Sequence, residues 1–193
     1  MKHENYIEII DKTAVYPQTV DNFGKAYCFF GLTGEWQEML IDYKKVIYGS
    51  GTALEENIKA LGKEIGDVIW YITCACKEFG SISALECLDI ISNQEASPYY
   101  SNSEEILEMA NNVPFATLSE PLKKFYRDGK PIEADLINNL LNTCCKYLGE
   151  IISEEEGLDL DQILKNNYEK LMKRRTTGTL HGDGSNREEA ANA

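Results

Sequence analysis

Two pairs of carboxylates, each set inside an apolar helical pattern, constrain this 193-residue chain more than any other feature. Glu35 and Glu38 lie within GLTGEWQEML, and Glu64 and Asp67 lie within LGKEIGDVIWYI. Residues three positions apart are only about 60° apart around a helix, so each pair shares a stripe with Leu, Ile and Trp side chains. Such a stripe normally faces protein interior, where an unpaired carboxylate is costly. Four acids on two such stripes need a compensating charge, and a hard divalent cation is the simplest one.

Helical periodicity extends along most of the chain. The pattern predicts a short helix over 5–12, a helix from about 19 to 48, a helix from about 53 to 79, and two later helices within IEADLINNLLNTCCKYLGEIISEEEG and DLDQILKNNYEKLMKRR. No segment shows the sustained alternation with β-branched residues that is typical of strands. We therefore expect an all-α fold, built as a helical bundle.

The composition limits the classes of partner. A formal net charge of −13 at pH 7 argues against a nucleic-acid-binding protein, because phosphate contacts need clustered Lys and Arg. The first residues lack the pattern of a signal peptide, and no apolar run approaches the roughly 18 residues of a membrane span. We expect a soluble, cytoplasmic protein with no membrane partner. A small phosphorylated ligand is compatible with the charge, because a bound metal reverses the local sign.

The cysteines do not indicate a zinc site. Side chains one or two positions apart on a helix point in different directions, so neither CxC nor CC forms a metal clamp. The six residues are Cys28, Cys74, Cys76, Cys87, Cys144 and Cys145. We interpret them as small core residues in a reducing compartment.

Spacing alone leaves two interpretations of the four acids. Acid pairs are common on the solvated faces of acidic helices, where they form salt bridges. However, both pairs lie beside apolar residues such as Leu32 and Trp70, and like charges at this spacing disfavour a helix unless something neutralises them. The turn at 49–52 would bring the two helices face to face, which suits Mg²⁺ with its preference for oxygen ligands. Asp42, one turn after Glu38, is either an auxiliary ligand or a surface residue.

The motifs resemble a known family, the MazG-like all-α nucleoside triphosphate pyrophosphohydrolases. GLTGEWQE at 31–38 and KEIGDVIWY at 63–71 are similar to the family's ExxE and ExxD helices. NYEKLMKR at 167–174 resembles its NxxKLxxR segment, and RTTGTLHGDGSNR at 175–187 resembles the glycine-rich ending of one branch. The resemblance implies a bundle of the all-α NTP pyrophosphatase type, formed as a single domain over 1–193.

The resemblance also implies an activity and a set of site residues. The reaction would be the Mg²⁺-dependent hydrolysis of an NTP or dNTP to a nucleoside monophosphate and pyrophosphate, possible also with Mn²⁺, by a homodimer or homotetramer. Glu35, Glu38, Glu64 and Asp67 would ligate the metal and carry the catalysis. Lys45, Asn167, Lys170 and Arg174 would contact the phosphates. Trp36 and Trp70 are candidates to stack on a base, although core packing is favoured for Trp70.

The chain departs from the family pattern in three places. Trp36-Gln37 replaces the small pair often found within ExxE, and Ser185 stands where the tail pattern has Asp. Nearly ninety residues separate the ExxD and NxxKL segments, so about 81–130 is predicted to be a helical insertion that serves as a lid, an added helical layer or an interface. The glycine-rich segment 176–193 is predicted to be a tail, in which Gly182-Asp183-Gly184 would form either a phosphate nest or a mobile terminus.

A second class of function stays open at this level. The chain could instead be a non-catalytic helical module that binds a nucleotide or a protein partner, with the insertion as its docking surface. An acidic structural bundle is a third reading, and it predicts no stabilisation by Mg²⁺. The presence of all four acids favours the enzyme.

Overall fold

The computed structural model describes residues 1–16, 23–93 and 102–180, and its regular structure is helical. The elements are α1 (His3–Thr13), α2 (Phe23–Ile47), α3 (Thr52–Phe79), α4 (Ala84–Ser92), α5 (Ser103–Asn111), the 3₁₀ helix η1 (Phe115–Leu118), α6 (Ser119–Asp128), α7 (Ala134–Glu154) and α8 (Leu160–Thr176). These ranges contain no β-strand, so the predicted all-α bundle is confirmed. The start of the helix expected from residue 19 lies outside the described residues.

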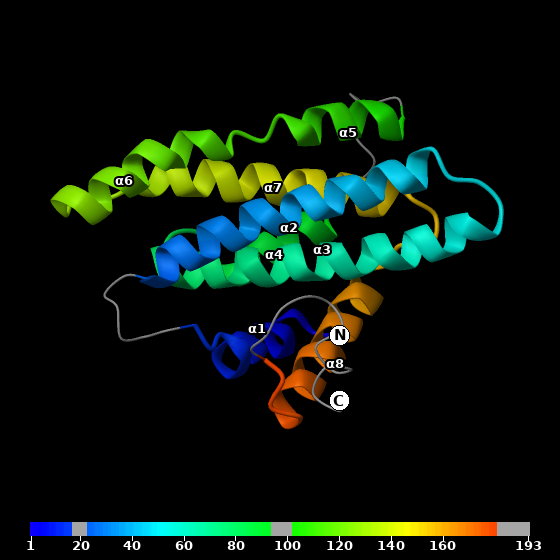
Figure 1. The fold of residues 1–193 in the computed structure, drawn as a ribbon, viewed down its shortest axis with the longest axis horizontal. Helices are drawn as coiled ribbons and strands as arrows, with labels where there is room; N and C mark the ends of the chain where they lie inside the picture. The colour runs from blue at the N-terminus through cyan, green and yellow to red at the C-terminus, as the bar shows by residue number, and fades with distance from the viewer. Residues whose placement is uncertain (17–22, 94–101, 181–193) are drawn as a thin grey trace.

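The centre of the molecule is the antiparallel hairpin of α2 and α3 (Figure 1). Each helix buries apolar residues at helical spacing, with Leu32 and Met39 on α2 and Leu61 and Ile65 on α3. Burial of such residues, at about 25 cal/mol per Å² of apolar surface, is the main force that holds two helices together. The hairpin therefore fixes the faces on which the two acid pairs lie.

A layer made of α4, α5, η1, α6 and α7 packs on one side of this hairpin (Figure 1). It contains the described parts of the segment 81–130, which the sequence predicts to be a lid, an added helical layer or an interface. The described part of that segment buries apolar side chains from each of its helices, among them Leu88, Ile106, Leu118 and Leu122. The described part of the segment is helical and its side chains form part of the core.

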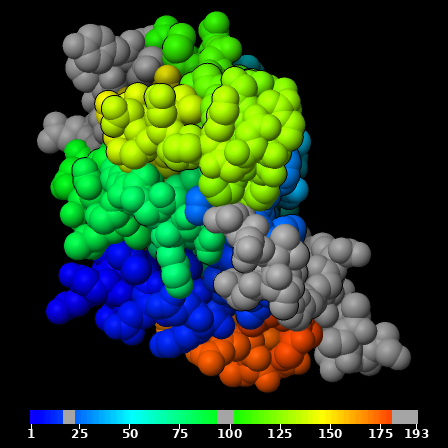
Figure 2. Space-filling model, turned by 90° about the vertical axis from the view of Figure 1, so that its left-hand side faces the viewer, coloured from blue at the N-terminus to red at the C-terminus, as the bar shows by residue number. Residues whose placement is uncertain are grey.

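The short helices α1 and α8 lie on the other side of the hairpin, in contact with each other and with α3. Figure 2 views the molecule from one end, where α1 and α8 lie below the green residues of α3 and α4, and α6 lies above them. This arrangement brings α8, from the end of the chain, against the helix that carries Glu64 and Asp67. The candidate site lies in this contact.

All six cysteines are buried and free of disulfides, as expected for core residues. In the part of the chain that the structure describes, no helix combines the length and the apolar character that a membrane span requires.

Candidate metal centre

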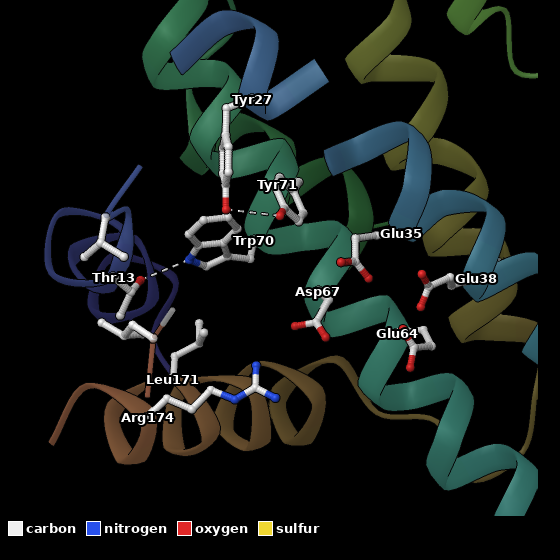
Figure 3. A pocket seen from close by; sticks show the side chains of 12 residues that line it. Thr13, Tyr27, Glu35, Glu38, Glu64, Asp67, Trp70, Tyr71, Leu171 and Arg174 are labelled. Atoms are coloured by element: carbon white, nitrogen blue, oxygen red, sulfur yellow. Dashed lines mark hydrogen bonds between the residues drawn. The ribbon is translucent and has the colours of Figure 1, made fainter. Parts of the chain in front are cut away.

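Three of the four predicted acids meet in one cluster. Glu35 from α2 and Glu64 and Asp67 from α3 each present a carboxylate oxygen, and these oxygens lie within 4.8 Å of one another. Glu38 lines the same cavity but is exposed and does not belong to this cluster. Figure 3 shows all four side chains directed into the space between α2 and α3. The pairing of the two acidic helices predicted from sequence is therefore present in the structure.

The cluster carries excess negative charge. Burial is the main cause that raises the pKa of Glu35 to about 7, and the charge of Asp67 is the next. Burial and then Asp67 also raise the pKa of Glu64 above its ordinary value. Clustered carboxylates that resist ionisation are a donor set suited to a hard divalent cation, because the cation relieves their repulsion and takes oxygen ligands. The residues fit a Mg²⁺ ion.

Asp67 connects the acids to α8. Its oxygens accept hydrogen bonds from Nδ2 of Asn167 at 2.8 Å and from Nζ of Lys170, at 2.6 Å to Oδ2. Asn167 is in turn held by Tyr6, whose hydroxyl donates to its Oδ1 at 2.9 Å. These contacts join α1, α3 and α8 in one chain of hydrogen bonds. Two of the residues expected from sequence at the phosphates, Asn167 and Lys170, thus lie beside the carboxylates.

The close approach of α8 depends on Gly66, which lies between the two acids of ExxD. A Cβ atom at this position would stand 3.0 Å from Cβ of Asn167. Any side chain here would therefore push Asn167 away from Asp67. Glycine at this position allows the contact between the acidic helix and the cationic helix.

Beyond the acids, the cavity is walled by aromatic residues. The cavity has a volume of about 290 Å³, and Tyr27, Trp70 and Tyr71 line it together with Thr13 and Val15. Trp70 is held in place by a hydrogen bond from its Nε1 to Oγ1 of Thr13, at 3.0 Å. The rings of Tyr27 and Tyr71 are 5.8 Å apart, and their hydroxyls are 3.4 Å apart. The cavity thus has an acidic end and an aromatic end, which Figure 3 shows at right and left.

A second glycine shapes the aromatic end. Gly31 lies on α2 one turn from Tyr27 and one turn from Glu35, and a Cβ there would overlap the ring of Tyr71 at 2.0 Å. Its lack of a side chain lets the Tyr71 ring lie across α2.

Arg174 closes the lower side of the cavity, where Figure 3 shows its guanidinium directed toward the acids. It lies one turn after Lys170 on α8. The chain then turns back, with Gly178 at φ +72° and the amide of Thr179 bonded to the Arg174 carbonyl at 2.8 Å. This turn brings Leu180 to the cavity. The rest of the predicted tail, including the Gly-Asp-Gly sequence, lies outside the described residues.

Two predicted substrate contacts need correction. Trp36 is fully buried on the other side of α2, where its Nε1 donates to the Ala110 carbonyl at 3.0 Å. It packs against the ring of Phe115 and cannot stack on a ligand in the cavity. Lys45 does not line the cavity; it is exposed, and its Nζ is 2.6 Å from an oxygen of Asp42. The Asp42 side chain is only 14% exposed and forms an ion pair with Lys45.

Sequence analysis did not single out Tyr27, Thr13, Leu171 or Leu180 as cavity residues, and it favoured core packing for Trp70. A signal for Tyr27 is present: with Gly31 and Glu35 it follows a spacing of four, which places all three near one face of α2. No comparable signal exists for Thr13, because its position depends on how α1 docks against Trp70.

Comparisons of the chain with protein-family models, with curated proteins and with solved structures found no match. The case for a function therefore depends on the residues of this chain and on the resemblance of its motifs.

Proposed function

We propose that this protein is a Mg²⁺-dependent pyrophosphohydrolase of nucleoside triphosphates, the activity that its MazG-like motifs imply. The observation that carries the proposal is the cavity itself, in which clustered carboxylates, Arg174 of α8 and an aromatic wall occur together, with Lys170 of α8 paired to Asp67 beside it. A triphosphate needs a metal and cations, and a base needs flat apolar surface. A purely structural acidic bundle would have no use for this combination.

The carboxylates of α2 and α3 and the cations of α8 would have different roles. Glu35, Glu64 and Asp67 would hold Mg²⁺, which supplies neutralisation of phosphate charge and a more acidic bound water. Lys170 neutralises Asp67 in the metal-free protein and would be free to bind a phosphate oxygen once a cation takes its place. Arg174 would bind a second phosphate oxygen in the bidentate manner that suits guanidinium.

Glu38 is the best candidate for the general base. It lines the cavity but stands outside the cluster, so its carboxylate would be available to accept a proton. The water oxygen would form a bond to phosphorus as the bond to the departing pyrophosphate breaks, and the water proton would pass to Glu38.

A panel assay tests the proposal. The protein would be incubated with canonical and modified NTPs and dNTPs, with Mg²⁺ and with chelator, and nucleoside monophosphate and pyrophosphate would be measured. We expect release only with metal, at least a hundredfold slower in Glu38→Gln and unchanged in Glu169→Gln, whose carboxylate is exposed and outside the cavity. Binding of nucleotides without any hydrolysis would overturn the proposal in favour of a binding module.

We also propose a homodimer or homotetramer. Phe30 and Ile41 are 70% and 54% exposed on α2, and Tyr48, just beyond its end, is 68% exposed. Their spacing of eleven and seven residues places them near one face of the helix, with the exposed Gln37 and Lys44 between them. Large exposed apolar side chains on one face support association. Sedimentation equilibrium tests this: we expect the wild type to be a dimer or tetramer and Phe30→Glu/Ile41→Glu to be a monomer. A monomeric wild type would contradict the proposal.

A further inference from the structure

A groove between α3 and α8 is separate from the carboxylate cavity. Its volume is about 840 Å³, within the range of small-molecule sites. Its lining comes from residues 58–63 of α3, from the turn at 157–159 and from α8, and it shares no residue with the carboxylate cavity. Asn167 and Lys170 line the groove and bond to Asp67 of the neighbouring cavity, so these contacts form the wall between the two.

The groove is cationic, although the chain is strongly acidic. Four lysines line it, namely Lys59, Lys63, Lys170 and Lys173, against one acid, Asp159. The carboxylate of Asp159 is already engaged, because it caps α8 by accepting a hydrogen bond from the amide of Gln162. Lys59 and Lys63 form no ion pair with any of the described residues. Lys59 and Lys63 therefore add unpaired ammonium groups to the lining, whereas Lys170 is paired with Asp67.

The floor between these lysines is apolar. Ile58, Leu158 and Ile163 line it together with Gly62, whose Cβ position lies 3.6 Å from Leu158 and 3.8 Å from Ile163. An inorganic anion would leave this surface without a partner. A ligand that has a flat apolar portion and an anionic group satisfies both the floor and the lysines.

Two amides add hydrogen-bonding groups at the α8 side. Gln162 donates from Nε2 to Oδ1 of Asn166 at 2.6 Å. This bond leaves Oε1 of Gln162 as an acceptor and Nδ2 of Asn166 as a donor, side by side in the lining. A neighbouring donor and acceptor match the edge of a nucleobase.

We propose that this groove is a second small-molecule site that binds a nucleoside phosphate through residues the carboxylate cavity does not use. The base would lie on Ile58, Leu158 and Ile163, and the phosphates would lie at Lys59 and Lys63. The proposal does not require the chain to hydrolyse nucleotides, because none of the groups that carry it belongs to the acid cluster.

Binding of ADP in the presence of EDTA, measured by titration calorimetry, tests the site without any contribution from a metal. We expect Lys59→Ala/Lys63→Ala to weaken binding at least tenfold. The matched control Lys12→Ala/Lys130→Ala removes two lysines that are also exposed but lie outside the groove, and it should bind ADP within twofold of the wild type. Equal affinity in wild type and Lys59→Ala/Lys63→Ala would overturn the proposal and place the nucleotide at Lys170 and Arg174 instead.

Two further measurements separate the parts of the ligand. Gly62→Leu fills the floor without altering charge and should weaken ADP at least tenfold while leaving pyrophosphate binding unchanged. Pyrophosphate alone should bind at least fivefold more weakly than ADP. If pyrophosphate binds as tightly as ADP, or if Gly62→Leu leaves ADP binding unchanged, the groove takes a simple anion and the nucleoside assignment is wrong.

Discussion

Asp67 is the residue at which the acidic and cationic parts of the candidate site meet. It belongs to the carboxylate cluster with Glu35, and it also accepts hydrogen bonds from Asn167 and Lys170. A cation that binds the cluster must therefore displace or share the ammonium of Lys170. The charge of this one side chain links metal binding to the position of α8.

Glu35 gives the metal-free protein a distinctive pH dependence. Its pKa is about 7 in the folded protein, against an ordinary 4.5, so folding disfavours the charged form. The contribution of Glu35 to stability is fully present below pH 4.5 and is lost as pH rises through 7. In EDTA, urea unfolding should therefore show wild type losing stability over this range, and Glu35→Gln should lose about 1 kcal/mol less, since solvent screens this partly exposed group. Identical pH profiles for the two proteins would contradict this, and Glu169→Gln is the matched control.

Lys170→Met tests the ion pair with Asp67. The side chains of Lys170 and Asp67 are only 24% and 25% exposed, so removal of the ammonium leaves a partly buried carboxylate without its counter-charge. We expect a loss of about 1–2 kcal/mol in the metal-free protein at pH 8, measured by urea denaturation. Lys165→Met, on the exposed side of the same helix, should change stability by less than about 0.5 kcal/mol. Equal effects of the two substitutions would show that the pair contributes nothing.

At the scale of elements, α3 uses three of its faces in different ways. One face packs against α2, a second presents Glu64 and Asp67, and a third, at Gly62 and Gly66, receives α8. Gly66 allows the close approach of α8, because a Cβ there would stand 3.0 Å from Asn167, whereas a Cβ at Gly62 would make only ordinary contacts.

The substitution Gly66→Ala tests whether the cost of overpacking against α8 exceeds the gain in helix propensity. Alanine gains about 1 kcal/mol over glycine within a helix, but its Cβ would stand 3.0 Å from Asn167 and overpacking costs about 1–3 kcal/mol. We expect net destabilisation, together with weaker Mn²⁺ binding as Asn167 shifts from Asp67. Gly34→Ala is the matched control: nothing lies within 4 Å of its Cβ, so it should stabilise the protein by up to about 1 kcal/mol. A stabilised Gly66→Ala would mean that α8 adjusts freely, and thermal denaturation distinguishes the two results.

The sequence was sufficient for the elements and for the acidic half of the site. Periodicity gave the long helices, and two ExxE-type spacings on consecutive helices predicted the meeting of Glu35 with Glu64 and Asp67. The sequence does not show which element packs against which face of a helix, so residue roles that depend on this packing could not be predicted. Trp36 and Glu35 are neighbours in sequence, yet only the docking of α5 on α2 determines that the indole faces the core. The aromatic wall depends in the same way on how α1 and α8 dock.

At the scale of the whole molecule, the two sides of the α2–α3 hairpin have different roles. The layer of α4 to α7 supplies core, and no described residue of 81–130 lines the carboxylate cavity. The opposite side, where α1 and α8 dock, carries the cavity and the lysine groove.

A substitution at Trp36 tests whether the two sides of the α2–α3 hairpin have separate roles. Trp36 joins α2 to the layer of α4 to α7 and faces away from the cavity. Trp36→Phe removes the hydrogen bond to the Ala110 carbonyl, which keeps only the longer bond from the Val113 amide at 3.4 Å, and it also removes buried ring volume. Together these losses should cost about 1–3 kcal/mol in urea unfolding. Unfolding should remain a single transition, since both layers share one core, and Mn²⁺ and nucleotide affinities should stay within twofold. Trp70→Phe, which alters the cavity wall, should weaken nucleotide binding severalfold. Weaker nucleotide binding by Trp36→Phe at unchanged stability would instead assign Trp36 to the ligand and contradict the separation of the two sides.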